Sequence, residues 1–582
     1  MKPFRFSYTL LLAGALSLTQ TSCNKALELD PLDQLSDAAY WTSPNDFLLA
    51  ANAFYPYMRT FADVVYDTPP NTSNQNYHTD YKADILASQN IFSRGLNTVP
   101  TTDSPYSNGY TRIRNINYLL SKVPTYPTPA EISKYVAEAK FFRAYIYFDL
   151  LQVYGGVPII SKLLAPDSPE LQAPRNTRDE VVDFIIKDLN DAIADLPVKT
   201  AQTAAELGRI NKEVAQSFLG RVALYEGTWQ KFRSGARANT LLDMAISASG
   251  AVITGGQYQL FAPAALGDSA QKYMFILENQ KSNPASIQKS ANNEYILANR
   301  YDQTVRMINN NVSRSTPINL TRNFVNLYLS KDGLPIEKSP LFKGYATMTS
   351  EFENRDNRMR YNMKIAGGYY WSPNANWRID WTGGPADRAN ADGSPFKPYA
   401  NGTSGYYSQK WVAERQVPDN QEAYDYPVIR YAEVLLNYAE AVFERNGTIS
   451  DADLDKSLNL VRNRVNKAMP KLSTQFVTTN GLDMRTEIRR ERTIELYQEG
   501  FRLDDLKRWH NAVEVLTKPL VGVKWTGTEF QTLWPSQAAT AKDAEGNLIV
   551  DGSRSFSEKN YLLPIPSQQI QLNPKLEQNT GW

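Results

Sequence analysis

Acidic and basic residues crowd one stretch of the chain, residues 488–509, in a pattern that could support catalysis. Its carboxylates are Glu491, Glu495, Glu499, Asp504 and Asp505, and its arginines are Arg489, Arg490, Arg492, Arg502 and Arg508. Two carboxylates held about 5 to 9 Å apart can hydrolyse a glycosidic bond. However, arginines interleaved at helical spacing keep such acids ionised and paired instead of raising one pKa for general-acid work. The pattern therefore favours a structural ion-pair network.

Other catalytic chemistry lacks the residues that it needs. The chain has two histidines, His78 and His510, and a single cysteine, Cys23, which leaves little material for a nucleophilic pair or a transition-metal site. Neither histidine is accompanied by a G-x-S-x-G elbow, and glycine-rich phosphate motifs are absent. Asp-rich loops leave a bound calcium possible, but no EF-hand-like spacing supports it. We therefore predict no catalytic residues, no cofactor and no metal site.

Aromatic residues offer a different chemistry, which is ligand binding by stacking. The densest cluster is formed by Tyr369, Tyr370, Trp371, Trp377 and Trp381, followed by Tyr399, Tyr406, Tyr407 and Trp411. Sugar rings present apolar C–H faces, on which exposed Trp and Tyr can stack while polar side chains bind the hydroxyls. Most of these aromatic residues are expected in the core. From composition and loop placement, we predict ligand contacts by Tyr77, Tyr81, Trp371, Trp377 and Trp381.

The N-terminus predicts export. Lys2 and Arg5 precede an apolar run, residues 6–18, that is short for a membrane span. The run leads to Cys23, in an arrangement that resembles a bacterial lipoprotein signal, although Gln20 departs from the usual aliphatic residue. We predict a signal peptide at residues 1–22 and acylation of Cys23, which would anchor the chain without a transmembrane helix. An ordinary secretory signal with an incidental cysteine is the alternative.

The sequence also contains helical patterns, which would position the charged and aromatic residues described above. Thr128, Pro129 and Glu131 have N-cap, N1 and N3 spacing, which lets the Thr and Glu side chains satisfy free backbone N–H groups. A broad apolar stripe then runs to Gly155, Gly156 and Pro158, where a helix must end. We also predict that Asn117, on the preceding helix, bonds a neighbouring backbone. Further helical patterns follow at residues 177–196, 208–225 and 241–253, the first with a capping box.

The alternation of helices defines the predicted fold. It suggests tetratricopeptide-like pairs, although no strict 34-residue repeat is legible. Between residues 256 and 426 the helical rhythm gives way to Gly, Pro, Asn and aromatic residues, and it resumes at Pro427. We predict a mainly α protein, with a helical-pair scaffold at 23–255 and 427–582 and an irregular, loop-rich subdomain at 256–426. Formal net charge of +1 argues against nucleic-acid binding.

Several separated motifs resemble one known family. They are EAKFFRAY with GGVP at residues 138–158, RYAEVLLNYAEA at 430–441, the charged stretch at 488–509, and LPIP, NP and QN near the C-terminus. Together with the lipoprotein-like signal, they resemble the SusD/RagB family of nutrient-binding outer-membrane lipoproteins. The resemblance covers the whole chain.

The resemblance implies a role in nutrient import. Family members sit as a lid on a SusC-like, TonB-dependent transporter and help to capture oligosaccharides, which implies a lipid-anchored protein on the outer face of the outer membrane. Some members resemble peptide importers instead. A glycoside hydrolase on a helical scaffold and a helical adhesin are the alternatives from other classes. The family's ligand residues have no fixed motif, so the resemblance assigns none here.

Overall fold

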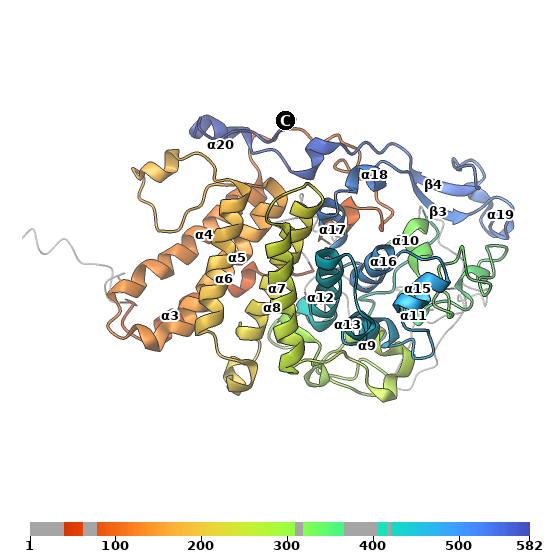
Figure 1. The fold of residues 1–582 in the computed structure, drawn as a ribbon, viewed down its shortest axis with the longest axis horizontal. Helices are drawn as coiled ribbons and strands as arrows, with labels where there is room; N and C mark the ends of the chain where they lie inside the picture. Colours follow the sequence, from red (N-terminus) through yellow and green to blue (C-terminus); the bar gives the residue numbers. More distant parts are fainter. Residues whose placement is uncertain (1–39, 62–77, 309–317, 366–403, 416–420) are drawn as a thin grey trace, which may run out of the picture.

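The computed structural model describes residues 40–61, 78–308, 318–365, 404–415 and 421–582. In it the chain is mainly helical, and the first half of the described residues forms an array of antiparallel helices (Figure 1). These are α3 (Pro44–Asn52), α4 (Ser104–Lys122), α5 (Pro129–Tyr154), α6 (Arg178–Asp195), α7 (Lys212–Lys231) and α8 (Ala238–Gly255). From α4 onward each helix packs on the next, which confirms the predicted tetratricopeptide-like arrangement.

Helix α5 is the central element of this array. Its aromatic residues Phe141, Phe142, Tyr145 and Phe148 are all buried, because neighbouring helices cover it on several sides. The helix ends as expected at Gly155, whose φ of 78° is unfavourable for residues that carry a Cβ. A long apolar helix and a glycine stop therefore form as the sequence predicts.

Three local predictions can be compared with the observed hydrogen bonds. The Thr177 capping box forms, with its hydroxyl accepting from Glu180 N (3.3 Å) and the Glu180 carboxylate accepting from Thr177 N (2.7 Å). Asn117 donates to the carbonyl of Ile160 (2.8 Å), as predicted. Thr128 is the N-cap and Pro129 the first helical residue, as predicted, but the predicted cap bond is wrong, because the Thr128 hydroxyl donates to the Glu131 carboxylate (2.9 Å) and makes no bond to the backbone.

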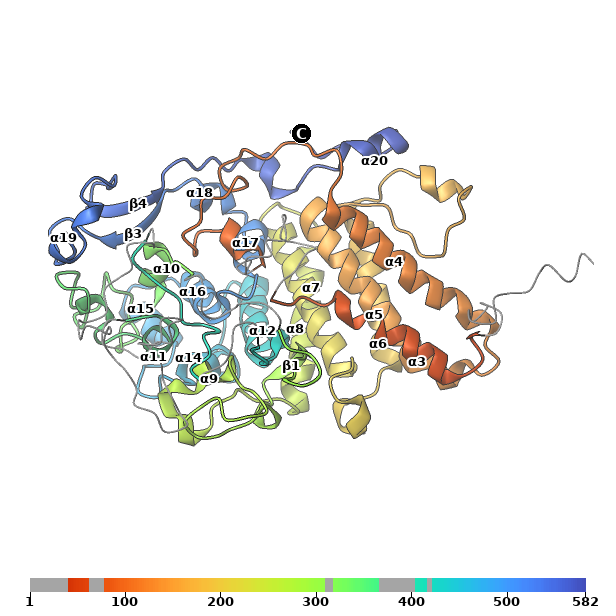
Figure 2. The ribbon, with the colours of Figure 1, turned by 180° about the vertical axis from the view of Figure 1, so that it is seen from behind.

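The second half of the described residues contains shorter elements (Figure 2). Its helices are α9 (Ala270–Met274), α10 (Arg322–Leu327), α11 (Asn357–Asn362), α12 (Tyr431–Asn446), α13 (Asp451–Asp455), α14 (Leu458–Asn463), α15 (Thr474–Thr479), α16 (Met484–Leu496), α17 (Arg502–Arg508), α18 (Ala512–Leu516), α19 (Phe530–Leu533) and α20 (Ser567–Leu572). Helix α12 packs on both α8 and α16 and so joins the two halves. The described helices at residues 256–426 are short, as the sequence suggests, and the proposed subdomain boundaries stay a prediction.

Two short antiparallel ladders interrupt the helices. Strand β1 (Tyr295–Asn299) pairs with β2 (Tyr426–Arg430), and β3 (Leu520–Lys524) pairs with β4 (Asn547–Asp551). The prediction that the helical pattern resumes at Pro427 is therefore wrong by four residues, since α12 begins at Tyr431. Pro427 disfavours helix before it, while the β-branched Val428 and Ile429 suit a buried strand.

The C-terminal segment crosses the top of the helical array in Figure 1. The Asn579 side chain donates to the carbonyls of Tyr154 (3.0 Å) and Leu563 (2.6 Å), so it satisfies a free acceptor at the end of α5. No helix within the described ranges combines the length and apolar content needed to cross a bilayer. In the same part of the chain, no cluster of three His, Cys, Asp or Glu residues has an arrangement suited to a metal ion.

Candidate functional site

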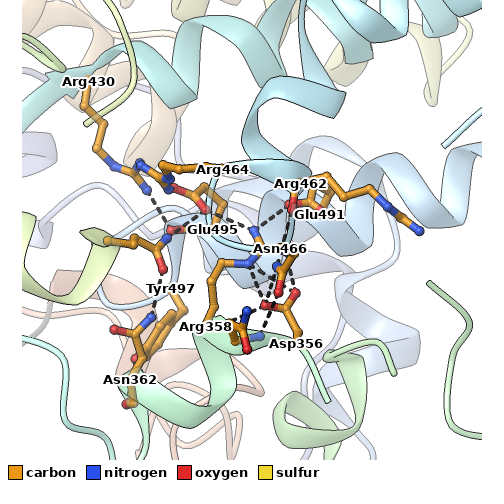
Figure 3. Close-up of polar contacts among 12 residues, drawn as sticks. Asp356, Arg358, Asn362, Arg430, Arg462, Arg464, Asn466, Glu491, Glu495 and Tyr497 are labelled. Atoms are coloured by element: carbon orange, nitrogen blue, oxygen red, sulfur yellow. Dashed lines mark hydrogen bonds and ion pairs between the residues drawn. The ribbon is translucent and has the colours of Figure 1, made fainter. Parts of the chain in front are cut away.

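The carboxylates of residues 488–509 lie in the interior, at the junction of several elements. Glu491 and Glu495 project from α16, Glu499 follows that helix, and Asp504 and Asp505 lie on α17. Glu495 is 0% exposed and contacts three guanidinium groups, those of Arg430 (2.7 Å), Arg358 (3.0 Å) and Arg464 (Figure 3). A carboxylate enclosed in this way has no face open to a substrate.

The network continues on both sides of Glu495, as Figure 3 shows in part. Arg358 also binds Glu491 (2.5 Å) and Asp356 (2.8 Å). On the other side, Arg430 binds Glu294 (2.9 Å) and Glu499 (2.7 Å), and Glu499 in turn accepts from Lys410 (2.6 Å). Cations and anions alternate, so buried charges are compensated by their neighbours.

The electrostatics of this network oppose general-acid chemistry. Burial alone would raise the pKa of Glu495, but Arg464, Arg430 and Arg358 outweigh it and hold the pKa well below its usual range. The pKa of Glu499 is lowered in the same way by Arg430 and Lys410. Burial does raise the pKa of Glu491, yet its side chain lies in the interior against Arg358. The structure confirms the predicted ion-pair network.

The partners of these acids differ from those expected. Sequence reasoning paired them with interleaved local arginines, whereas Arg358, Arg430 and Arg464 lie 137, 65 and 31 positions from Glu495. Two of the local arginines do pair within the stretch, since Arg492 (2.8 Å) and Arg508 (2.9 Å) both bind Asp505. No spacing rule identifies such distant partners, although the RYAE block that contains Arg430 marked one of them.

Four of the five predicted ligand-contacting residues, Tyr77, Trp371, Trp377 and Trp381, lie outside the described residues, as does Cys23. The fifth, Tyr81, lies on the 3-10 turn η2 (His78–Lys82), is half-buried, and has the Lys82 ammonium 5.5 Å from its ring centre. The structure therefore does not test the predicted set, and the assignments stay predictions.

The later aromatic residues of the cluster belong to the core. Tyr406, Tyr407 and Trp411 are buried, and the Trp411 ring stacks on Tyr424 and packs edge-on against Phe275. These rings hold the irregular region together and cannot stack on a ligand, as expected for most of the cluster.

A projecting loop that the sequence did not single out is a candidate ligand contact. The Asp302 carboxylate accepts from Thr304 N (2.8 Å) and Thr304 Oγ1 (2.7 Å), which fixes a tight turn. At its tip Val305 is 87% exposed, and beyond it the Arg306 guanidinium lies 4.6 Å from the Tyr301 ring centre. The loop thus presents an apolar tip, whereas the Arg306 guanidinium is held by Asn299 Oδ1 (2.6 Å). An Asp-x-Thr turn was the only sequence signal.

Comparison with known families decides the classification. A sequence model described as "SusD family" matches residues 275–582, which is more than half of the chain. The chain belongs to the SusD family. A second model, described as "Starch-binding associating with outer membrane", matches residues 71–224. Together the two matches include all four motif regions that carried the resemblance.

Individual SusD-like proteins agree with this assignment. A SusD-like protein from Bacteroides ovatus is 23% identical over 81% of this chain and 80% of its own length. SusD-like protein P38 from Formosa agariphila is 27% identical over 34% of this chain, and the chain spans only 39% of that relative. A crystal structure of a SusD-like carbohydrate-binding protein from Bacteroides fragilis, 23% identical, superposes with a TM-score of 0.70 over 92% of this chain and all of the other. The fold is that of SusD-like proteins.

Proposed function

We propose that this protein is a cell-surface glycan-binding lipoprotein that captures oligosaccharides and delivers them to a SusC-like, TonB-dependent outer-membrane transporter. The observation that carries the proposal is the SusD-family match, together with the match to a family described as starch-binding and associated with the outer membrane. The carbohydrate-binding description of the Bacteroides fragilis protein with the same fold supports the same class of ligand.

The proposed mechanism is capture without bond cleavage. Aromatic side chains such as Trp371, Trp377 and Trp381 would stack on sugar rings, with Tyr77 and Tyr81 as further contacts. The buried acids argue against hydrolysis, because the cluster that could have supplied two catalytic carboxylates is committed to arginines. Acylation at Cys23 would hold the protein at the membrane surface beside its transporter. Energy for import would come from the transporter's own partners.

Binding and cleavage can be separated in one experiment. The soluble chain, residues 24–582, is titrated calorimetrically against plant, host and microbial oligosaccharides and against peptides, with release of reducing ends measured in parallel. Saturable sugar binding without cleavage is the expected result. Cleavage would replace the proposal with a hydrolase, and binding of peptides alone would place the protein among peptide importers.

Two further measurements address the site and the partner. Replacing Trp371, Trp377 and Trp381 with alanine should weaken glycan binding at least tenfold, since stacked rings supply much of the contact area. The matched control is Tyr118→Ala, which removes an exposed ring from α4.

Co-purification from native membranes should recover a TonB-dependent transporter, and its absence would contradict the delivery role.

A further inference from the structure

A small cavity lies where helices α5 and α7 meet α17. Phe148 and Gln152 of α5, Leu224 and Tyr225 of α7, and Asp504 of α17 are among the residues that line it. It offers about 30 Å³ to the centres of water-sized molecules, which is room for about two waters. A sugar ring or another organic ligand needs a far larger site. The occupant that the cavity can hold is therefore very small.

The charges around this cavity are compensated within the protein. Four arginines line the cavity, and each has a carboxylate partner. The pairs are Arg59 with Asp149 (3.8 Å), Arg221 with Glu433 (2.6 Å), Arg492 with Asp505 (2.8 Å) and Arg508 with Glu440 (2.5 Å). Asp504 in turn lies 3.8 Å from the Lys507 ammonium. A balance of positive and negative charge favours a neutral occupant over an ion.

Two buried polar groups at the cavity have no hydrogen bond to the protein. Tyr225 is 4% exposed, and no described residue forms a hydrogen bond with its hydroxyl. The Arg178 guanidinium lies near this hydroxyl without bonding to it, and is paired with Glu226 (2.7 Å). The Asp504 carboxylate is buried as well, and it accepts no hydrogen bond from any described residue. Buried polar groups are costly without a hydrogen bond, so both groups need a partner.

The two groups are near enough to influence each other. Burial and the Asp504 carboxylate together raise the pKa of Tyr225. Burial also raises the pKa of Asp504, although Lys507 opposes this shift. A tyrosine hydroxyl can donate a hydrogen bond and a carboxylate can accept one, whereas a water molecule does both. One water can therefore satisfy the two groups at once.

We propose that this cavity binds an ordered water, which accepts a hydrogen bond from the Tyr225 hydroxyl and donates one to the Asp504 carboxylate. Buried waters typically make about three hydrogen bonds, and the Gln152 amide on α5 offers a third partner. The water thereby connects α7 of the helical array to α17 in the second half of the chain. This site does not depend on the proposed function.

A crystal structure at a resolution that shows ordered water tests the site directly. The expected result is a water within hydrogen-bonding distance of both the Tyr225 Oη atom and an Asp504 carboxylate oxygen. Two results would overturn the inference. One is a direct bond between the hydroxyl and the carboxylate, and the other is a hydroxyl with no ordered water beside it.

Urea denaturation tests the site in solution through the sign of one effect. If water satisfies the hydroxyl, Tyr225→Phe removes a hydrogen bond and should lower the midpoint of unfolding by roughly 0.1 to 0.3 M. If the hydroxyl has no partner, the same variant removes an unsatisfied buried group and should raise the midpoint instead. The matched control is Tyr118→Phe, because Tyr118 is 38% exposed, and its midpoint should stay unchanged. A raised or unchanged midpoint for Tyr225→Phe would refute the water site.

A double-mutant cycle tests whether Asp504 is the second partner. In an Asp504→Ala background the bridge is already broken, so Tyr225→Phe should lower the midpoint by less than it does in wild type. The matched background is Asp268→Ala, since Asp268 is exposed and does not line the cavity, and there the effect of Tyr225→Phe should be as large as in wild type. Equal losses in the Asp504→Ala and wild-type backgrounds would show that no water links the two side chains.

Discussion

The interior of the helical array and the junction around Glu495 are stabilised mainly by different interactions. In the array, residues such as Phe141, Leu189 and Phe218 form a large apolar core, and its buried charges occur in separate pairs such as Arg143 with Asp188 (2.7 Å). At the junction, Glu495 is equally buried and is held by the three arginines Arg358, Arg430 and Arg464. Burial of apolar surface tolerates imperfect neighbours, whereas a buried charge depends on every partner.

This contrast predicts the largest loss at the junction. Glu495→Ala would leave three buried guanidinium groups without their common anion, and we expect a loss of about 5 kcal/mol in the free energy of unfolding. Urea denaturation followed by circular dichroism measures the change. The control is Arg445→Met, which breaks an ion pair with Asp243 in which the arginine side chain is 34% exposed, and should cost less than about 1 kcal/mol. Equal losses in the two variants would remove the distinction between the regions.

A cavity in the helical array should have a slightly smaller effect. Phe218 packs against Phe141, Tyr145 and Phe148 of α5, so Phe218→Ala should destabilise the protein by about 4 kcal/mol. The conservative variant Phe218→Leu should recover much of this loss in the same urea assay. If Phe218→Leu destabilised the protein as much as Phe218→Ala, the lost side-chain volume would not explain the effect.

The pH dependence of the free energy of unfolding should sharpen the comparison further, because the Asp80 carboxylate is buried and accepts its hydrogen bonds from backbone N–H groups instead of from an arginine side chain. Its fully buried carboxylate accepts from the backbone N–H groups of Gly500 and Arg502 (both 3.1 Å), and burial raises its pKa to about 7. Between pH 4 and pH 7 the folded state therefore keeps a proton that the unfolded state has lost. Stability contributed by this group is present below pH 4 and falls as pH rises through 7.

The measurement compares wild type with Asp80→Asn at several pH values. Relative to the variant, wild type should lose roughly 3 to 4 kcal/mol of stability between pH 4 and pH 8, at about 1.36 kcal/mol per pKa unit. The exposed Asp268 provides a control, and Asp268→Asn should follow wild type closely. A pH-independent difference between wild type and Asp80→Asn would show that Asp80 has an ordinary pKa in the folded protein.

The smallest expected effect is at a helix end. Thr177→Ala removes the hydroxyl that accepts from Glu180 N, and we expect a loss of about 1 kcal/mol. Thr128→Ala is the matched comparison, because the Thr128 hydroxyl makes no cap bond to the backbone and its removal should cost less. Equal losses would mean that the geometry of the cap matters little here.

The helical array could be predicted from the sequence because its information is local. The stop at Gly155 and the capping box at Thr177 both involve residues a few positions apart, and apolar periodicity marks the buried face of each helix. Strand β2 was missed, because its pairing with β1 involves residues more than 120 positions away, and a short apolar run does not by itself distinguish strand from helix.

The candidate site was less predictable. The sequence identified the acids around Glu495 as structural, because many arginines lie nearby in the chain, and it was right about local partners for Asp505 but wrong for Glu495, whose arginines are distant. A cleft lined by Lys82, Asp103 and Lys507 has no sequence signature, since these residues come from three distant segments. Aromatic composition indicated stacking chemistry, but composition alone could not separate Trp411, which is core, from residues available to a ligand.

The bond from Asn579 to the carbonyl of Tyr154 has a consequence for the order of events during synthesis. These residues are 425 positions apart, so this bond cannot form until almost the whole chain has been synthesised, whereas the Arg175 side chain, 21 positions away, can bond the same carbonyl (2.9 Å) much earlier. Helix α5 is the central element of the array, and its final packing must therefore follow translation of the distant segment. The last contacts of the central helix are therefore made late in synthesis.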